Sequence, residues 1–132
     1  MMNRGKLSII IGFVFLVLFF NPLKFFGQGC PEVPMSILDG TNGFVLEGLD
    51  IGDVSGYSVS EAGDVNGDGY ADILIGALGA DPGGDYDAGE TYVVFGKADG
   101  FEANVDLGAL DGNDGFVLEG IDAGDWSGRS VS

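Results

Sequence analysis

The chain has 132 residues, of which 25 are glycine, 21 are acidic, five are basic and none is histidine. Three of the basic residues precede residue 30 and every acidic residue follows it, so residues 31–132 carry a net charge of −19. This charge argues against nucleic-acid binding, which needs a basic surface. The lack of histidine excludes Ser-His-Asp and Cys-His catalytic centres. The single cysteine, Cys30, cannot form an intrachain disulfide.

Residues 1–29 have the pattern of a targeting segment. Basic residues open it, and residues 7–20 form an apolar run that we expect to be a hydrophobic helix. The run is about 14 residues long, which is shorter than the roughly 20 residues that span a bilayer. A cleaved signal peptide is therefore favoured over an uncleaved anchor or a lipidated Cys30. The sequence predicts a secreted or cell-surface protein whose membrane contact is limited to residues 1–29.

The remainder of the chain contains an internal repeat. Residues 39–60 and 111–132 are identical at 16 of 22 positions, with an offset of 72 residues. Such a repeat implies that one supersecondary unit is used more than once. We therefore treat residues 36–132 as one repeat region, with a full first copy and a partial second copy at residues 111–132.

One period contains four short segments that are rich in β-branched or aromatic residues and are separated by Gly, Asp and Asn. They predict strands over residues 44–47, 57–60, 72–77 and 90–95. No segment after residue 30 shows helical periodicity over three turns. Four strands per period predict an all-β fold made of antiparallel four-stranded propeller blades.

A loop between the second and third of these strands has the composition of a calcium site. Residues 64–72 read Asp-Val-Asn-Gly-Asp-Gly-Tyr-Ala-Asp. Oxygen-bearing side chains alternate along it, glycines allow tight curvature, and calcium prefers six to eight oxygen ligands. Without a cation the carboxylates would repel one another, which favours a bound ion over an empty polar turn. The candidate ligands are Asp64, Asn66, Asp68, Tyr70 through its backbone carbonyl, and Asp72.

The segments that flank the loop decide between families that share it. An EF-hand needs Glu at the twelfth position, which is Ile75 here, and a dockerin module needs an acidic residue there and a helix after it. Here the loop leads into the strand predicted at residues 72–77. Three further segments carry the resemblance: Ser55-Gly56-Tyr57-Ser58-Val59, Ile75-Gly76-Ala77-Leu78-Gly79-Ala80-Asp81 and Tyr92-Val93-Val94-Phe95-Gly96.

Together these segments resemble the FG-GAP repeat of integrin α-subunit β-propellers and their bacterial relatives. The resemblance covers residues 36–132 and implies that the five candidate ligands of the loop bind calcium. The family's Phe-Gly is Ser55-Gly56 here, and its Gly-Ala-Pro is Gly76-Ala77-Leu78. Neither departure removes a metal ligand.

Other acidic residues have simpler interpretations. A second cation site is conceivable in residues 81–87, but the spacing lacks a closing ligand and favours a solvated acidic loop. The acidic residues that recur in the repeat are interpreted as turn formers between blades, and Trp126 as a packing residue at an edge. The recurring acidic residues are Asp50, Asp53, Asp122 and Asp125.

The function expected from the resemblance is that of a secreted calcium-binding module for adhesion or protein interaction, with an extracellular protein or glycan as partner. No enzymatic activity is expected, because the chain has no histidine and no nucleophile-elbow motif. One alternative is a fragment of a larger hydrolase or phospholipase whose catalytic domain lies elsewhere. The other is a truncated gene product without function.

The truncation alternative depends on how the second copy ends. Ser132 aligns with Ser60, four residues before the calcium loop of the first copy. Blades normally bury their faces against neighbouring blades. A single blade is therefore expected to leave four apolar side chains partly exposed, namely Ile73, Ile75, Val93 and Phe95.

Overall fold

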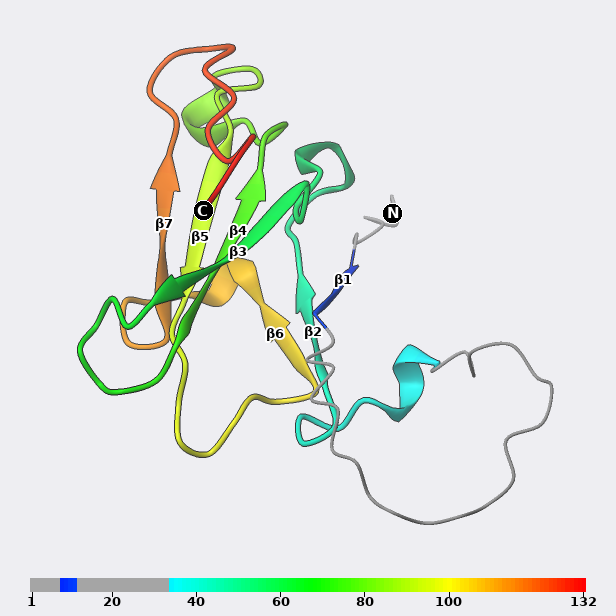
Figure 1. Cartoon of the computed structure of the whole chain (residues 1–132). Helices are drawn as coiled ribbons and strands as arrows, with labels where there is room; N and C mark the ends of the chain where they lie inside the picture. Colours follow the sequence, from blue (N-terminus) through cyan, green and yellow to red (C-terminus); the bar gives the residue numbers. More distant parts are fainter. Residues whose placement is uncertain (1–7, 12–33) are drawn as a thin grey trace, which may run out of the picture.

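The computed structural model describes residues 8–11 and 34–132 (Figure 1). Within these ranges the chain is all-β, and its helical turns are all short 3₁₀ helices. The strands are β1 (Ser8–Ile11), β2 (Phe44–Glu47), β3 (Ser58–Gly63), β4 (Asp72–Ala77), β5 (Glu90–Val94), β6 (Asn104–Asp106) and β7 (Gly115–Glu119). The 3₁₀ turns are η1 (Met35–Ile37), η2 (Ile51–Asp53), η3 (Pro82–Gly84) and η4 (Leu107–Ala109).

The larger sheet has four strands in the order β3-β4-β5-β7, and all of its pairs are antiparallel. Ile75 in β4 lies opposite Val59 on one side and Tyr92 on the other. The central strand β4 is a continuous run of buried residues except for Leu74, which is half-buried. A strand that reads as a continuous apolar run is suited to a central position that is covered on both faces.

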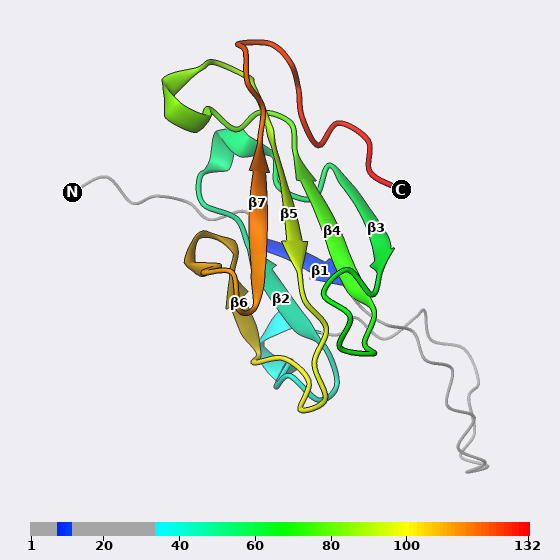
Figure 2. The same cartoon turned by 90° about the vertical axis from the view of Figure 1, so that its left-hand side faces the viewer.

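The smaller sheet has the order β1-β2-β6. In it β2 pairs antiparallel with β1 and parallel with β6. Figure 2 shows this sheet lying behind the larger one, so that the molecule has two β layers. Two facing sheets bury the side chains that alternate onto their inner faces.

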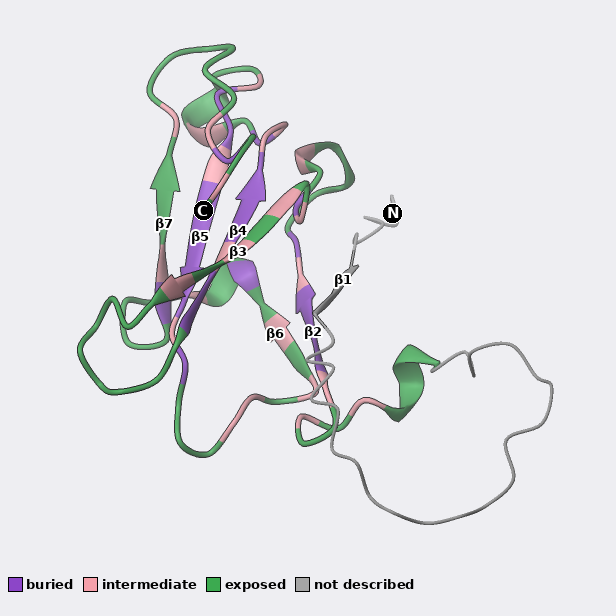
Figure 3. Cartoon of the chain, in the orientation of Figure 1, coloured by how far each residue is buried: buried purple, intermediate pink, exposed green. Residues whose placement is uncertain are grey.

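The hydrophobic core lies between the two layers. Its buried members come mainly from β2, β4 and β5, and Figure 3 shows the buried residues concentrated in these strands, whereas the long loops are exposed. Phe44 of β2 stacks on Phe101 with ring centroids 4.2 Å apart, which closes one end of the core. The buried members are Phe44, Leu46, Ile73, Ile75, Ala77, Ala80, Tyr92, Val94 and Leu107.

The four-stranded sheet confirms the predicted antiparallel fold class, but its fourth strand is not the predicted one. Residues 44–47, expected to join the other strands of the period, form β2 in the smaller sheet. The equivalent segment of the second copy, β7, takes the fourth place beside β5. The physical reason is chain proximity: β7 follows β5 after only β6 and η4, and it completes the open edge of β5. Strand β3 is also longer than predicted and runs on to Gly63.

The expected exposure of the blade's apolar side chains is wrong for three of the four residues. Ile73, Ile75 and Val93 are 7%, 0% and 3% exposed, and Phe95 is half-buried. The smaller sheet covers the face of β4 that carries Ile73 and Ile75. On the other face, Phe95 makes an edge contact with Phe116 of β7, with ring centroids 5.8 Å apart. A second layer from the same chain therefore takes the place of a neighbouring blade.

The C-terminal segment crosses the outer face of the four-stranded sheet. Ser127 bridges Gly89, and the hydroxyl of Ser58 donates to the carbonyl of Gly128 at 2.7 Å. A Cβ atom at Gly76 would collide with that same carbonyl, so only glycine allows this close approach. Trp126, which was expected to pack at an edge, is 44% exposed.

Of the targeting segment at residues 1–29, the structure describes only residues 8–11, which form β1. The hydrophobic helix was expected at residues 7–20, and apart from residues 8–11 this stretch lies outside the described residues. The helix therefore stays a prediction. Among the residues that the structure describes, no helix has the length and apolar character needed to span a membrane.

Candidate functional site

The candidate calcium loop connects β3 to β4 at one end of the larger sheet. Gly67 and Gly69 have φ angles of 78° and 91°, values that side chains other than glycine rarely adopt. These two left-handed residues turn the chain back on itself within a few positions. The side chains of the loop are exposed until Asp72, the first residue of β4.

Asp64 organises the first half of the loop. Its carboxylate accepts backbone N–H groups from Gly67, Asp68 and Gly69 at 2.8, 3.0 and 2.9 Å. Three N–H dipoles directed at one carboxylate stabilise its charge and fix its position. The carboxylate at the first position of the motif is therefore the centre around which the loop folds.

The next two oxygen-bearing side chains follow the same pattern over a shorter range. Asn66 Oδ1 accepts the N–H of Asp68 at 3.0 Å, and Asp68 Oδ1 accepts the N–H of Tyr70 at 2.9 Å. The Asn66 amide donates to Asp68 Oδ2 at 2.9 Å. These Asx turns hold alternate side chains close to the loop backbone.

Asp72 closes the loop from inside the protein. Its side chain is 1% exposed. One oxygen accepts the N–H of Val65 at 2.7 Å, and the other accepts the N–H of Gly96, two residues after β5, at 2.8 Å. Asp72 therefore joins the start of the loop to the neighbouring strand, and its carboxylate is satisfied by backbone donors.

The sequence that contains this loop and its two flanking strands matches a family model. The model is that of the FG-GAP repeat, and it aligns with residues 55–94. The chain carries an FG-GAP repeat. No match was found among curated proteins or among solved structures. The aligned segment of the FG-GAP repeat begins just before β3, contains the whole 64–72 loop and β4, and ends at the last residue of β5.

The FG-GAP repeat's loop supplies the donor type that calcium prefers. All of its candidate ligands are oxygen atoms, and residues 64–72 include no basic residue that would compete for the carboxylates. A carboxylate oxygen that accepts one hydrogen bond keeps a second lone pair for a cation. In the described part of the chain, however, no three acidic side chains are gathered closely enough to hold a metal ion. The donors fit calcium by their chemistry, and binding requires their side chains to converge.

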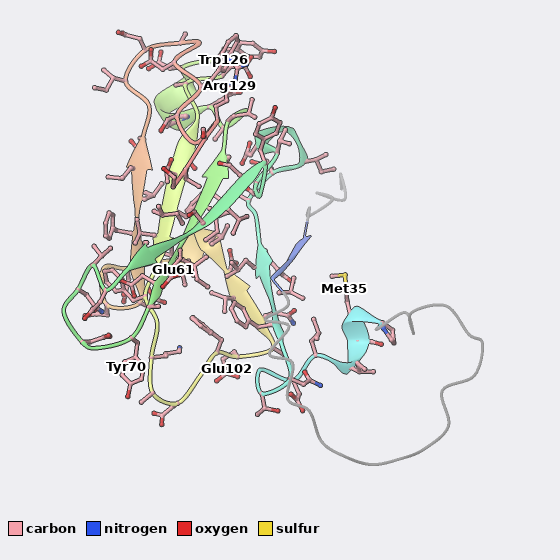
Figure 4. All side chains as sticks on the ribbon, in the orientation of Figure 1. Met35, Glu61, Tyr70, Glu102, Trp126 and Arg129 are labelled. Atoms are coloured by element: carbon pink, nitrogen blue, oxygen red, sulfur yellow. The ribbon has the colours of Figure 1, made fainter. Side chains whose placement is uncertain are left out.

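Figure 4 shows Tyr70 at the end of the molecule opposite Trp126 and Arg129. The side chain of Tyr70 is 45% exposed. Its predicted role as a ligand uses the backbone carbonyl, so the exposed ring takes no part in it. Trp126 and Arg129 contact each other instead, with the guanidinium 5.3 Å from the ring centroid.

The second acidic loop of the FG-GAP repeat behaves as a solvated turn. Asp81 and Asp85 are exposed, Asp87 is half-buried, and Asp81 accepts the N–H of Asp87 at 2.7 Å. The turn-forming role of the recurring acidic residues is confirmed. Asp53 accepts the N–H of Asp50 at 3.2 Å, and in the second copy Asp125 accepts those of Ile121 and Asp122 at 3.3 and 2.9 Å.

The structure also reveals an acidic pocket that sequence reasoning missed. It has a volume of about 390 Å³ and lies where β4 ends and β5 begins, at the opposite end of the sheet from the 64–72 loop. Its carboxylates come from separate segments of the chain, so no local motif could reveal it. The acidic residues that line the pocket are Asp50, Asp53, Asp81 and Glu90.

These pocket carboxylates differ in their electrostatics from those of the loop. Burial raises the pKa of Glu90, and the charges of Asp53 and Glu119 raise it further, although a hydrogen bond from the Tyr92 hydroxyl opposes the shift. Burial also raises the pKa of Asp53, with repulsion from Asp50 and Asp81 adding to it. The arrangement favours proton uptake by the pocket.

Proposed function

We propose that the FG-GAP repeat of this chain is a calcium-binding module of an extracytoplasmic protein that acts in adhesion or protein interaction. The observation that supports calcium most directly is the environment of Asp64, whose carboxylate is fixed by three backbone N–H groups in an exposed loop. A carboxylate that is already positioned needs little further ordering when a cation binds. The loop residues that would hold calcium are Asp64, Asn66, Asp68, Tyr70 and Asp72.

The proposed mechanism assigns different tasks to the loop residues. Asp64 and Asp68 supply exposed charge, and Asn66 supplies a neutral oxygen between them. Asp72 anchors the loop to Gly96, so that movement of the loop side chains is transmitted to the end of β5. Bound calcium would draw the loop carboxylates together, neutralise their charge and hold the loop in one conformation, which suits a recognition surface.

Extracytoplasmic location is supported by the charge distribution of the sequence. The net charge of −19 over residues 31–132 follows an apolar run with a basic start, which is the pattern of an exported protein. Mass spectrometry of the exported product should find a mature N-terminus near Cys30. An intact N-terminus on a cytoplasmic product would contradict export without bearing on calcium.

The calcium proposal is tested by isothermal titration of the full chain. We expect a dissociation constant of about 10⁻⁴–10⁻³ M, the range of extracellular calcium modules. Asp68→Ala should weaken binding at least tenfold. Asp85→Ala removes the same charge from the acidic loop at the other end of β4 and should leave the affinity unchanged. Equal calcium heats from the wild-type chain and Asp68→Ala would contradict the assignment.

A further inference from the structure

The chain contains two Asn-Gly dipeptides, Asn42-Gly43 and Asn66-Gly67. An asparagine before glycine is prone to deamidation, because glycine has no side chain to shield the backbone nitrogen that attacks the asparagine side chain. Both asparagines are exposed, so water reaches each of them. The sequence alone therefore predicts similar reactivity at the two sites, and any difference between them must come from the fold.

The carbon that is attacked, Cγ of the asparagine, has matching surroundings at the two sites. Oδ1 of Asn42 accepts the N–H of Asp39 at 3.1 Å. Oδ1 of Asn66 accepts the N–H of Asp68 at 3.0 Å. Nδ2 of Asn42 donates to the carbonyl of Ile37 at 2.9 Å, and Nδ2 of Asn66 donates to Asp68 Oδ2 at 2.9 Å. The two side-chain amides are therefore polarised alike and do not distinguish the sites.

The attacking nitrogen is where the two sites differ. The N–H of Gly67 donates to the carboxylate of Asp64 at 2.8 Å. Attack requires the loss of this proton, which would place negative charge beside the carboxylate. Among the residues that the structure describes, the N–H of Gly43 has no hydrogen-bond acceptor. The nitrogen of Gly43 is therefore available for attack, whereas that of Gly67 is held by Asp64.

We infer that Asn42 is a spontaneous deamidation site of the folded chain, and that Asn66 is an equivalent site which the Asp64 carboxylate protects. In the reaction the nitrogen of Gly43 bonds to Cγ of Asn42, the Cγ–Nδ2 bond breaks, and the amide leaves as ammonia with the proton of Gly43. Water then opens the cyclic imide to give aspartate, or isoaspartate in which the backbone continues through Cγ. The net reaction consumes water and releases ammonia, without oxidation or reduction.

The second copy of the repeat indicates that the fold accepts the aspartate product. With the offset of 72 residues, Asn42 corresponds to Asp114. Oδ1 of Asp114 accepts the N–H of Asp111 at 3.2 Å, just as Oδ1 of Asn42 accepts the N–H of its own neighbour Asp39. An aspartate formed at position 42 can therefore keep the turn that precedes β2.

Deamidation removes one contact of this turn. Nδ2 of Asn42 is the donor to the carbonyl of Ile37, the last residue of η1. A carboxylate has no donor, so the product loses this bond and its oxygen repels the carbonyl. The modification therefore detaches η1 from the turn. At Asn66 the same reaction would replace the neutral oxygen of the calcium loop, a consequence that rests on the proposed function.

The test is a time course of deamidation in the full chain without added calcium, followed by peptide mass spectrometry. We expect Asn42 to convert at least about tenfold faster than Asn66, because the Gly67 N–H must first give up a hydrogen bond to a charged group. In urea, where neither turn is folded, the two rates should converge. Equal rates in the folded chain, or a rate ratio that persists in urea, would overturn the inference.

Substitution of Asp64 tests the protecting group itself. Asp64→Ala should accelerate deamidation at Asn66 by about tenfold or more and leave the rate at Asn42 unchanged. Asp64→Asn keeps an acceptor oxygen without the charge and should give an intermediate rate. Asp85→Ala, outside the loop, should change neither rate. An unchanged Asn66 rate in both Asp64 variants would overturn the inference. Neither measurement involves calcium, so failure of the calcium proposal would be a separate result.

Discussion

The two acidic regions of this chain lie at opposite ends of β4, and their carboxylates have different surroundings. In the 64–72 loop, Asp64 is surrounded by N–H groups from its own loop. In the pocket at the other end, Asp53 and Glu90 are partly buried beside other carboxylates. In the loop, backbone N–H dipoles stabilise the carboxylate charge. In the pocket, the carboxylates repel one another.

This difference separates a candidate cation site from a group of proton acceptors. Burial and mutual repulsion raise the pKa values of Asp53 and Glu90, so these two carboxyl groups keep their protons to a higher pH than solvated ones do. In the loop, Asp64 and Asp68 are exposed and Asp64 is held in place by backbone N–H groups, which suits a divalent ion once the other side chains converge on it. The number of acidic residues does not distinguish the two regions. The difference lies in the backbone N–H donors around the loop carboxylates and in the burial of the pocket carboxylates.

The largest effect should come from removing Asp72, which connects the loop to the sheet. Asp72→Ala leaves the N–H groups of Val65 and Gly96 without their acceptor inside the protein. Hydrogen bonds to charged groups contribute about 1.5–3 kcal/mol each, so we expect the free energy of unfolding to fall by about 3 kcal/mol. Urea denaturation measures this change. A loss below about 1 kcal/mol would show that Asp72 does not anchor the loop.

A smaller loss is expected at the organising residue of the loop. Asp64→Ala removes the acceptor of three N–H groups, but these groups are exposed and can bond to water. We expect a destabilisation of about 1 kcal/mol without calcium. Asp85→Ala, an exposed acidic residue outside the loop, should change stability by less than about 0.5 kcal/mol. Equal effects of the two substitutions would remove the distinction between an ordered and a solvated carboxylate.

The smallest effect concerns the pocket and appears as a pH dependence. The pKa of Glu90 in the folded chain is raised, so the folded state binds its proton more tightly than the unfolded state does. Stability should therefore increase as pH falls from neutrality toward 4.5, the ordinary pKa of Glu90. Glu90→Gln keeps an acceptor for Tyr92 and should flatten this increase. An unchanged pH slope in thermal denaturation would mean that the pocket charges do not oppose folding.

The positions of several strands could be predicted because the local pattern of apolar and turn-forming residues is enough to place them. β2 and β4 occupy their predicted residues, since glycine or aspartate bounds each apolar run. The choice of partner for β2 could not be predicted in this way. β2 and β7 have the same sequence, and tertiary context decides that one completes the blade while the other joins a second layer.

The candidate sites show the same division. The 64–72 loop was visible in the sequence because its oxygen-bearing residues alternate within nine positions. The acidic pocket was not visible, because Asp50 and Asp53 precede β3 whereas Asp81 and Glu90 follow β4, and the two segments meet only in the folded chain. The spacing of residues along the sequence is enough to predict a site within one loop. A pocket between distant segments can be predicted only when the pairing of the strands is known.

The most direct test of the account is a calcium titration followed by backbone amide NMR on the full chain. The account predicts that the amides of Gly67, Asp68 and Gly69 shift together and saturate at a dissociation constant of about 10⁻⁴–10⁻³ M. The amides of Asp53 and Glu90 in the pocket should not follow the same curve. Shifts centred on the pocket, or no saturable shift in the loop at millimolar calcium, would contradict the assignment of the loop as the calcium site.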